Sequence, residues 1–423
     1  MFGGLFMDIN LIEHNANCGP VDIDHYQREQ LACSLREIIL NTPAYSHYAE
    51  MLDGLSPANS IEFLRKLPTL TKQEVLENPE NYHRIDLTER QYAVRTGGTS
   101  GEILSFSRIK SEYEIERLHV EYCWSTAGIN LAQDKGVVLT ARVSKNSQDG
   151  LTYVDKNQIM WIGCPERTSE QWMKVYQSFN RYGPKYIRGY GSLVGGFFQF
   201  IDENDLEIPK SLEAVFYSSD PMSDSEKELI KSKYCANLLS LYGQTERVVM
   251  GITCGQGDRF HLLPSYGITE IVRDDGSLIE SPNEVGYVVS TSLYPRSCSL
   301  VRYHTGDMGS WAEGRCECGR EGPAISHFLQ RRHEMITNKF GESVNIGRRN
   351  SFLDFRDSLP IGTSVQFRQR EHGHIHVFIQ TKKKDFDLFE PAFRHLQKEF
   401  NTSFEFVDAP ILNKNGKRTL FVK

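Results

Sequence analysis

Strand-like and helix-like segments alternate through the middle of this chain, and this alternation restricts its possible folds more than any other feature. Compact apolar runs at Gly136–Thr140, Ala214–Tyr217 and Leu238–Leu241 are typical of buried strands, and helix-like patterns cover Ser111–Ala127 and Ser223–Lys233. Strands joined by crossover helices form a sheet with helices on its faces. The sequence therefore predicts an α/β domain.

The two ends of the chain differ from this middle part. Residues 1–85 are mostly helical in pattern. Near the other end, the strand-like segment Ser364–Gln369 is followed by an amphipathic helical pattern at Leu388–Glu399, which indicates a small α+β unit. We predict a large N-terminal domain of residues 1–333 and a small, mobile C-terminal domain of residues 334–423.

Composition excludes several classes of protein. The 423 residues include 48 Lys and Arg against 55 Asp and Glu, a formal net charge of −7, so no overall basic field attracts nucleic acid. No stretch approaches the roughly 20 apolar residues that cross a bilayer. Nine scattered cysteines suit reduced thiols better than a disulfide framework. We expect a cytoplasmic monomer or homodimer with no membrane or nucleic-acid partner.

A glycine-rich segment after a strand-like run is the sharpest local signal. Backbone N–H groups of glycines and nearby hydroxyls can surround a phosphate. Taken alone, the segment fits a plain surface loop equally well, and no lysine follows it as in a P-loop. The residues of the segment are Thr96, Gly97, Gly98, Thr99, Ser100 and Gly101.

Four further motifs follow in order. Tyr242-Gly243-Gln244-Thr245-Glu246 places an aromatic ring, a hydroxyl and a carboxylate just after an apolar strand. Asp307 ends the segment that begins at Arg302 and suits a ribose diol. Arg331–Ile336 lies where the small terminal unit begins, and Lys417 lies in a turn near the C-terminus. Each residue in isolation also fits an ordinary structural or surface role.

The order of these five motifs resembles the adenylate-forming, or acyl-adenylating, superfamily. Within it the chain is most similar to the branch of phenylacetate-CoA ligases and capsule-biosynthesis adenylyltransferases. The resemblance spans the whole chain and includes Asn41–Tyr45, Leu67–Lys72 and Lys185–Ser192. It implies a ligase that uses ATP and Mg²⁺ to activate a carboxylic acid as an acyl-adenylate, and then transfers the acyl group to coenzyme A.

The resemblance also implies roles for individual residues. The loop from Thr96 to Gly101 would cover the β and γ phosphates of ATP. Ser218, Ser219 and Asp220 match the segment that lines the adenine, on which Tyr242 would stack. Thr245 would contact the α-phosphate, Glu246 would hold Mg²⁺, and Asp307 would bind the ribose beside Arg331. Lys417 would bridge the acid and the α-phosphate, and Glu334 would be the hinge of a domain swing.

Three positions depart from the pattern of the superfamily. Glu102 and Ile103 stand where Lys-Pro is common, so contact with the triphosphate is expected to rest on backbone donors. Gln330 replaces the usual glycine before the hinge arginine, and Glu334 replaces the usual aspartate. These changes bear more on the domain swing than on adenylation.

Aromatic and small residues indicate a flat pocket for the acid, and the resemblance favours an aryl or arylacetic acid. Phe197 and Phe198 lie in the same stretch and could line the pocket as well, and core packing by a helix is the alternative. The candidate pocket residues are Tyr186, Tyr190, Gly191 and Ser192.

Four residues could form a zinc site. Thiolates and imidazole are preferred Zn²⁺ ligands, and three cysteines with one histidine form a known structural set. Some members of the ligase branch are similar here. Four inert residues are the alternative. The candidate ligands are Cys254, His261, Cys316 and Cys318.

Two alternatives to a CoA ligase stay open. The acyl-adenylate could pass to an amine, a hydroxyl or a carrier protein in a biosynthetic pathway. The chain could also be a nucleotide-binding protein without turnover, although the joint presence of Glu246, Asp307 and Lys417 argues against that.

Overall fold

The computed structural model describes residues 20–96, 104–147, 150–165, 167–220, 222–235, 237–257, 259–329, 335–345, 350–360, 363–381, 383–412 and 419–422. The chain forms two compact units, one of residues 1–128 with 241–330 and the other of residues 129–240 with 331–423. The break after residue 330 lies near the predicted boundary at 333. The predicted two-domain grouping stays a prediction.

Helices dominate the start of the first unit. The helix α2 ends at Asn41, two residues before Pro43, whose ring cannot continue a helix. Leu31, Leu35 and Ile39 of α2 are fully buried. The elements are α2 (Pro20–Asn41), η1 (Pro43–Gly54), η2 (Pro57–Asn59), α3 (Ser60–Lys66), α4 (Lys72–Glu77) and η3 (Pro79–Tyr82).

Antiparallel strands form the rest of the first unit. The hairpin of β1 (Tyr92–Arg95) and β2 (Ser105–Arg108) precedes α5 (Lys110–Ser125). The first seven strands of the large sheet run in the order β11, β12, β13, β14, β10, β9, β8. These strands are β11 (Gly267–Val272), β12 (Gly286–Ser292), β13 (Tyr303–Trp311), β14 (Ala324–Leu329), β10 (Phe260–Leu262), β9 (Met250–Ile252) and β8 (Leu238–Gly243).

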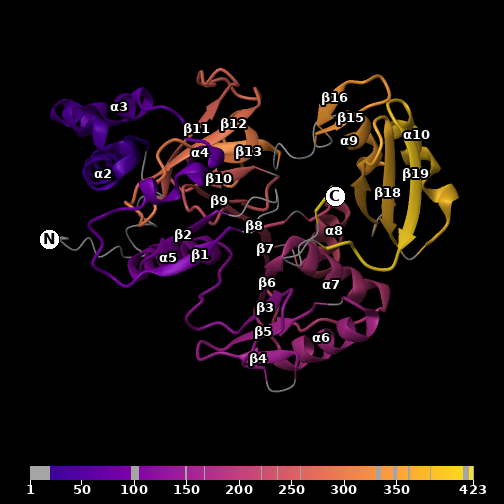
Figure 1. The fold of residues 1–423 in the computed structure, drawn as a ribbon. Coiled ribbons are helices and arrows are strands. Elements are labelled where there is room, and N and C mark those ends of the chain that lie inside the picture. Colours follow the sequence, from indigo (N-terminus) through magenta and orange to yellow (C-terminus); the bar gives the residue numbers. More distant parts are fainter. Residues whose placement is uncertain are drawn as a thin grey trace. The chain divides into compact units, whose positions relative to one another are not determined.

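The second unit contains the α/β part. Strands β7, β6, β3 and β5 are parallel, and β4 pairs antiparallel with β5. The apolar helix α7 packs on β3, β6 and β7 (Figure 1). The elements are β3 (Gly136–Thr140), β4 (Thr152–Val154), β5 (Ile159–Gly163), α6 (Ser169–Tyr182), β6 (Tyr186–Tyr190), α7 (Gly191–Glu203), β7 (Ala214–Ser218), α8 (Asp224–Leu229) and η4 (Ile230–Tyr234).

The C-terminal residues of the second unit have a separate aromatic core. β18 pairs antiparallel with β17 and parallel with β19. Phe352, Phe367 and Phe393 are buried between this sheet and its helices. The elements are β15 (Met335–Thr337), β16 (Ser343–Asn345), α9 (Asn350–Asp357), β17 (Ser364–Arg368), β18 (His374–Gln380), η6 (Phe386–Leu388), α10 (Glu390–Gln397) and β19 (Asn401–Val407).

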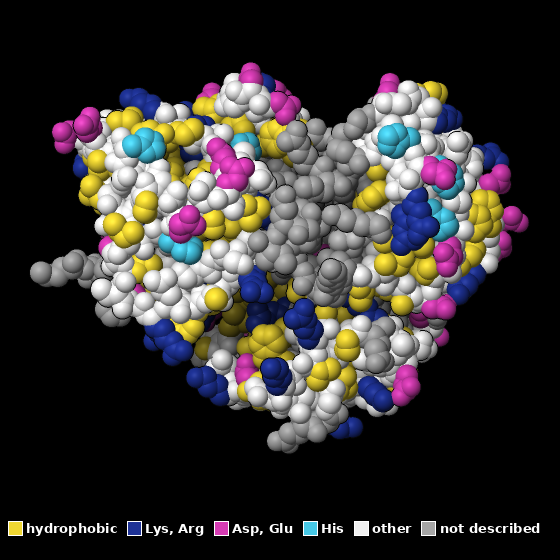
Figure 2. All heavy atoms as spheres, in the orientation of Figure 1, with side chains coloured by type: hydrophobic (Ala, Val, Ile, Leu, Met, Phe, Trp, Pro, Cys, Tyr) yellow, Lys and Arg dark blue, Asp and Glu magenta, His cyan; other side chains and the backbone are white. Residues whose placement is uncertain are grey.

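The predicted fold class is confirmed, because the structure combines parallel strands and crossover helices with a C-terminal α+β part. No helix within the described ranges is long and apolar enough to span a membrane. On the face drawn in Figure 2, Lys and Arg gather over the region of β4 to β7, while Asp and Glu are scattered. This is a local gathering on a chain with a net negative charge.

Candidate functional site

The end of β8 brings two of the predicted site residues together. Tyr242 is the penultimate residue of β8, and Asp307 lies within β13. The hydroxyl of Tyr242 donates a hydrogen bond of 3.0 Å to Oδ2 of Asp307. The Tyr242 ring packs edge-on against Phe260 at 5.9 Å between centroids, and both site residues are buried. The sheet thus holds the tyrosine and the carboxylate in one place although 65 residues separate them.

Glu246 is held by a tyrosine that sequence reasoning missed. The hydroxyl of Tyr303 donates to Oε1 of Glu246 at 3.2 Å. Burial raises the pKa of Tyr303, and the carboxylate of Glu246 raises it further, so the phenol stays a donor. Oε2 of Glu246 has no hydrogen-bond partner among the described residues. Tyr303 belongs to the Arg302–Asp307 motif, and its place in that motif was the signal in the sequence that could have indicated it.

Gly243 and Gln244 lie between Tyr242 and Glu246 in the sequence. Gly243 is exposed at the end of β8. The Gln244 amide is half-buried as a side chain, yet its Oε1 and Nε2 atoms are buried and have no partner within the described part of the chain. A buried amide without partners offers one acceptor and two donor hydrogens to a ligand.

The base of the glycine-rich loop is closed by two hydrogen bonds. The N–H of Thr96 donates to the carbonyl of Leu104, and the N–H of Leu104 donates to Oγ1 of Thr96, each at 2.9 Å. Thr96 is buried. Farther along β2, Nη2 of Arg108 donates to the carbonyl oxygen of Thr245. The hairpin is therefore tied to the segment that carries Glu246.

Several predicted residues lie outside the described residues, and their predicted roles stay predictions. They are Gly97, Gly98, Thr99, Ser100, Gly101, Arg331, Glu334 and Lys417.

In the second unit, the structure joins a predicted pocket residue to the predicted adenine segment. The hydroxyl of Ser192 donates to Oδ2 of Asp220 at 2.6 Å, and the Ser192 N–H donates to Oδ1 at 3.2 Å. The N–H of Asp220 donates to the carbonyl of Ser218, and Ser219 between them has a left-handed φ of 72°. Arg167, which no sequence motif signalled, donates from Nη1 to the Ser192 hydroxyl at 3.3 Å.

The aromatic residues of the predicted acid pocket divide into two groups. Tyr186, Phe197 and Phe198 are fully buried. The Tyr186 ring fills the space over Gly136, where an added Cβ would lie 2.1 Å from its Cζ. Core packing, the alternative stated above, therefore describes these three side chains. Tyr190 is only half-buried.

Four predicted metal ligands converge in the first unit. Cys254 follows β9, His261 lies in β10, and the two other cysteines lie in the turn after β13. Sγ of Cys254 is 3.5 Å from Sγ of Cys316, and Sγ of Cys318 is 3.5 Å from Nε2 of His261. All four ligand atoms lie within 4.8 Å of one another. Zinc bonds of about 2.0–2.3 Å in a tetrahedron give similar spacings between ligand atoms, so this donor set fits Zn²⁺.

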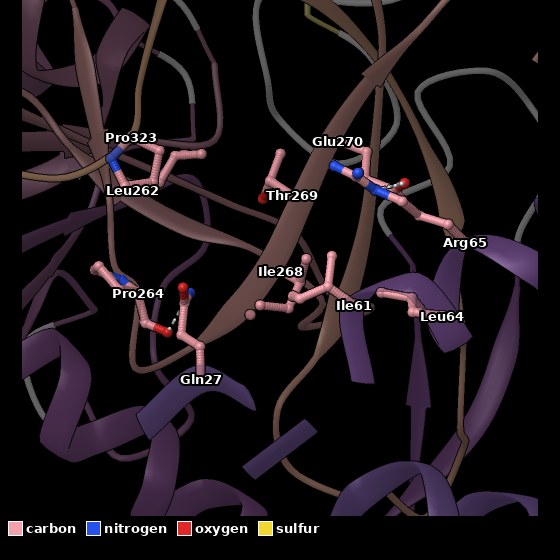
Figure 3. Close-up of a pocket in the computed structure, with 11 residues that line it drawn as sticks. Gln27, Ile61, Leu64, Arg65, Leu262, Pro264, Ile268, Thr269, Glu270 and Pro323 are labelled. Atoms are coloured by element: carbon pink, nitrogen blue, oxygen red, sulfur yellow. Dashed lines mark hydrogen bonds and ion pairs between the residues drawn. The ribbon is translucent and has the colours of Figure 1, made fainter. Parts of the chain in front are cut away.

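A cavity of about 150 Å³ lies elsewhere in the first unit, and no predicted site residue lines it. Figure 3 shows Gln27 near Pro264 and Arg65 beside Glu270 at its edges. Glu270 is buried and accepts from Nε of Arg302 at 2.9 Å, which anchors the residue before Tyr303. The cavity wall therefore supports the start of β13.

Comparison with known proteins identifies the fold. No family model matches the chain. It is 18% identical to protein CapK of Staphylococcus aureus over 373 residues, which cover 83% of this chain and 74% of CapK. It is 23% identical to phenylacetate-coenzyme A ligase of Thermus thermophilus over 129 residues, 30% of this chain and 29% of that ligase.

Solved structures give the same answer over most of the chain. 2-Hydroxyisobutyryl-CoA ligase in the postadenylation state is 15% identical, with a TM-score of 0.74 over 97% of this chain and 91% of that one. An ATP-bound RpMatB-BxBclM chimera is 15% identical, with a TM-score of 0.52 over 77% of this chain and 65% of that one. The chain has the fold of the adenylate-forming ligases. The resemblance stated from the sequence is confirmed at the level of the fold.

Proposed function

We propose that this protein is an enzyme that uses ATP to activate a carboxylic acid as an acyl-adenylate. The observation that carries the proposal is the pairing of Tyr242 with Asp307 at the end of β8, four residues from the carboxylate of Glu246. These side chains belong to the ordered motifs on which the resemblance to the adenylate-forming superfamily rests. The unpartnered amide of Gln244 adds a donor and an acceptor that suit the edge of a base.

In the proposed reaction, a carboxylate oxygen of the acid attacks the α-phosphorus of ATP. A bond forms between that oxygen and phosphorus, the bond to the bridging oxygen breaks, and pyrophosphate leaves with the electron pair. Asp307 binds the ribose hydroxyls, and Thr245 lies beside the α-phosphate. Oε2 of Glu246 is available to hold Mg²⁺. When bound, this cation neutralises charge on the leaving pyrophosphate.

Lys417 is proposed to bind the carboxylate and the α-phosphate together. A lysine is a mobile point charge that can reach a reacting centre from a neighbouring segment. Its place in the sequence motif Asn415-Gly416-Lys417-Arg418, one of the motifs that carry the resemblance, supports this role. Glu334 and Arg331 are proposed to lie at the hinge and beside the ribose.

The acyl acceptor is proposed to be coenzyme A. One structure of 2-hydroxyisobutyryl-CoA ligase in the same fold holds an acyl-adenylate and CoA together in the thioesterification state. Transfer to an amine is the second candidate, because the amide bond synthetase McbA of Marinactinospora thermotolerans has a TM-score of 0.50 to this chain at 14% identity. An aryl or arylacetic acid remains our proposed substrate, supported by the likeness to the phenylacetate ligase and by half-buried Tyr190.

We also propose that Cys254, His261, Cys316 and Cys318 hold one structural Zn²⁺. The support is the convergence of four ligand atoms within 4.8 Å, three of them sulfur. The ligands come from the residues after β9, from β10 and from the turn after β13, so bound zinc would fasten two neighbouring strands of the sheet to a turn.

The test is acid-dependent release of pyrophosphate from ATP across a panel of aryl, arylacetic and aliphatic acids. Parallel reactions with and without coenzyme A would be analysed for acyl-CoA. We expect release with at least one acid and a thioester when coenzyme A is present. Release without a thioester, together with an amide or ester when amines or alcohols are supplied, would favour the second candidate. Absence of release with every acid would contradict the proposed function.

A further inference from the structure

Arg108 is a buried arginine at the end of the strand that follows the glycine-rich loop in sequence, and that loop contains no lysine. It is the last residue of β2, four residues beyond Leu104, whose backbone closes the base of that loop. Its side chain belongs to the buried face of β2, and Arg108 is only 7% exposed. The same arginine donates from Nη2 to the carbonyl of Thr245. It therefore links the strand that follows the loop in sequence to the motif assigned to the α-phosphate.

The positive charge of Arg108 has no carboxylate partner among the described residues. Nε of Arg108 is buried and makes no hydrogen bond within the described part of the chain. Neighbouring Arg247 is different, because its Nη1 donates to the carbonyl of Glu112 at 2.9 Å and its Nε pairs with Glu116 at 3.3 Å. Arg108 and Arg247 are both buried, yet of the two only Arg247 pairs with a carboxylate among the described residues. Burial alone does not explain this difference.

Aromatic rings hold the guanidinium in place. The Arg108 guanidinium carbon lies 5.4 Å from the centre of the Phe106 ring and 5.8 Å from that of Tyr113. Burial lowers the pKa of Arg108 most, and the charge of Arg247 lowers it further, whereas the carboxylates of Glu112 and Glu116 raise it from a distance. A buried charge is costly unless it is paired. A negatively charged ligand would remove that cost, and a fixed planar guanidinium is well suited to phosphate.

We propose that Arg108 binds the triphosphate of ATP at the β-phosphate, and so supplies the positive charge that the loop lacks at Glu102. This inference rests on the proposed function and adds a phosphate-binding residue to it. As the α-phosphorus bond to the bridging oxygen breaks, the electron pair stays with pyrophosphate. An N–H of Arg108 donates to the oxygen that gains this charge. AMP carries no β-phosphate, so Arg108 contributes nothing to AMP binding.

The experiment measures dissociation constants of Mg·ATP, Mg·pyrophosphate and AMP by calorimetry for the wild type, Arg108→Gln and Arg108→Lys. Arg273→Gln is the matched control, since Arg273 is an exposed arginine of the same unit that pairs with Glu284. We expect Arg108→Gln to weaken the binding of pyrophosphate and ATP by about 10- to 100-fold, which is typical of a lost charged hydrogen bond. The binding of AMP should weaken by less than about threefold. Arg108→Lys should recover part of the loss, and Arg273→Gln should change none of the three.

The outcomes separate this proposal from the proposed function. Equal weakening of AMP and pyrophosphate would show that Arg108 only positions the Thr245 segment, and would overturn the proposal. Unchanged binding of all three ligands by Arg108→Gln would also overturn it, while leaving the adenylating function intact. Failure of the wild type to bind ATP and pyrophosphate would reject both the role of Arg108 and the proposed function. Circular dichroism checks that each variant folds. If Arg108→Gln does not fold, the ligand affinities of Arg108→Lys are compared with those of the wild type instead.

Discussion

The hydroxyl of Tyr242 donates to the carboxylate of Asp307 across 3.0 Å, and both residues are buried. We predict that Asp307→Asn weakens the binding of ATP and of AMP alike by about 10- to 100-fold, because an amide is a poorer acceptor than a carboxylate for two ribose hydroxyls. Tyr242→Phe should have a smaller effect, since the carboxylate remains. Binding of 2′,3′-dideoxy-ATP provides the check. Wild type should lose affinity for it, whereas Asp307→Asn should bind it about as well as ATP.

Glu246 offers a second test through its pairing with Tyr303. We predict that Glu246→Gln lowers acid-dependent pyrophosphate release by about 100-fold or more and raises the Mg²⁺ concentration needed for half-maximal rate. A neutral amide is a poor ligand for a hard cation compared with a carboxylate. Tyr303→Phe keeps the carboxylate and should retain most of the rate. Titration of Mg²⁺ at fixed ATP distinguishes these variants, and an unchanged Mg²⁺ dependence in Glu246→Gln would refute the assignment.

Lys417 is predicted to act on the chemical step rather than on nucleotide affinity. Lys417→Ala should reduce acyl-adenylate formation by about 10²–10³-fold, an amount typical of one lost charge-stabilising donor. The dissociation constant of ATP should change by less than about threefold. Lys423→Ala is a matched control, because it removes a lysine from the same end of the chain. Single-turnover measurement of the adenylate separates the step from binding. A normal rate in Lys417→Ala would reject the role.

The Cys/His cluster predicts one tightly bound zinc per chain. Purified wild type should contain about one equivalent of Zn²⁺ by elemental analysis, and Cys316→Ser should contain much less and unfold at a lower temperature, because bound metal stabilises the folded chain. Cys33→Ser is the control, since Cys33 is exposed and lies outside the cluster. Chelation of the wild type should reproduce the effect of Cys316→Ser. Metal-free wild type of unchanged thermal stability would contradict the prediction.

Local patterns predicted the elements of this fold well, because strand and helix signals depend on neighbouring residues. The apolar run Gly136–Thr140 is β3, and the pattern at Leu388–Glu399 contains α10. Ligand spacing likewise indicated the Cys/His cluster, although 62 residues separate Cys254 from Cys316.

Contacts between distant segments could not be predicted in the same way. The pairing of Tyr303 with Glu246 depends on where β13 lies in the sheet, and the β12–β13 register is irregular between Tyr287 and Val289. Arg108 and Arg167 carry no motif, and only the packing around them distinguishes them from surface arginines. Phe197 and Phe198 show a related limit, since the sequence suited a pocket and a core equally well and only the structure shows these two rings in the core.

The buried His119 of α5 should make the free energy of unfolding depend on pH. It is fully buried, its Nδ1 lies 2.8 Å from the carbonyl of Ile115, and its Nε2 lies 3.2 Å from Oγ of Ser265. Burial is the main cause that lowers its pKa to about 4, and nearby Arg296 adds to it. The unfolded chain, with a histidine pKa near 6.5, therefore binds more protons than the folded one between pH 4 and 6.5. The stabilisation from neutral His119 is complete above that range and is lost as the pH falls through it.

From pH 7 to pH 5 this single group should remove about 2 kcal/mol from the free energy of unfolding. The measurement is denaturant unfolding at both pH values, followed by fluorescence of the chain, which includes buried Trp124 on the same helix. His119→Gln lacks the titrating group, so its stability should fall by about 2 kcal/mol less than that of the wild type over the same interval. The comparison uses the change with pH in each protein, so the general destabilisation of a buried substitution cancels. Equal changes in the two proteins would mean that His119 is protonated in the folded chain at pH 5.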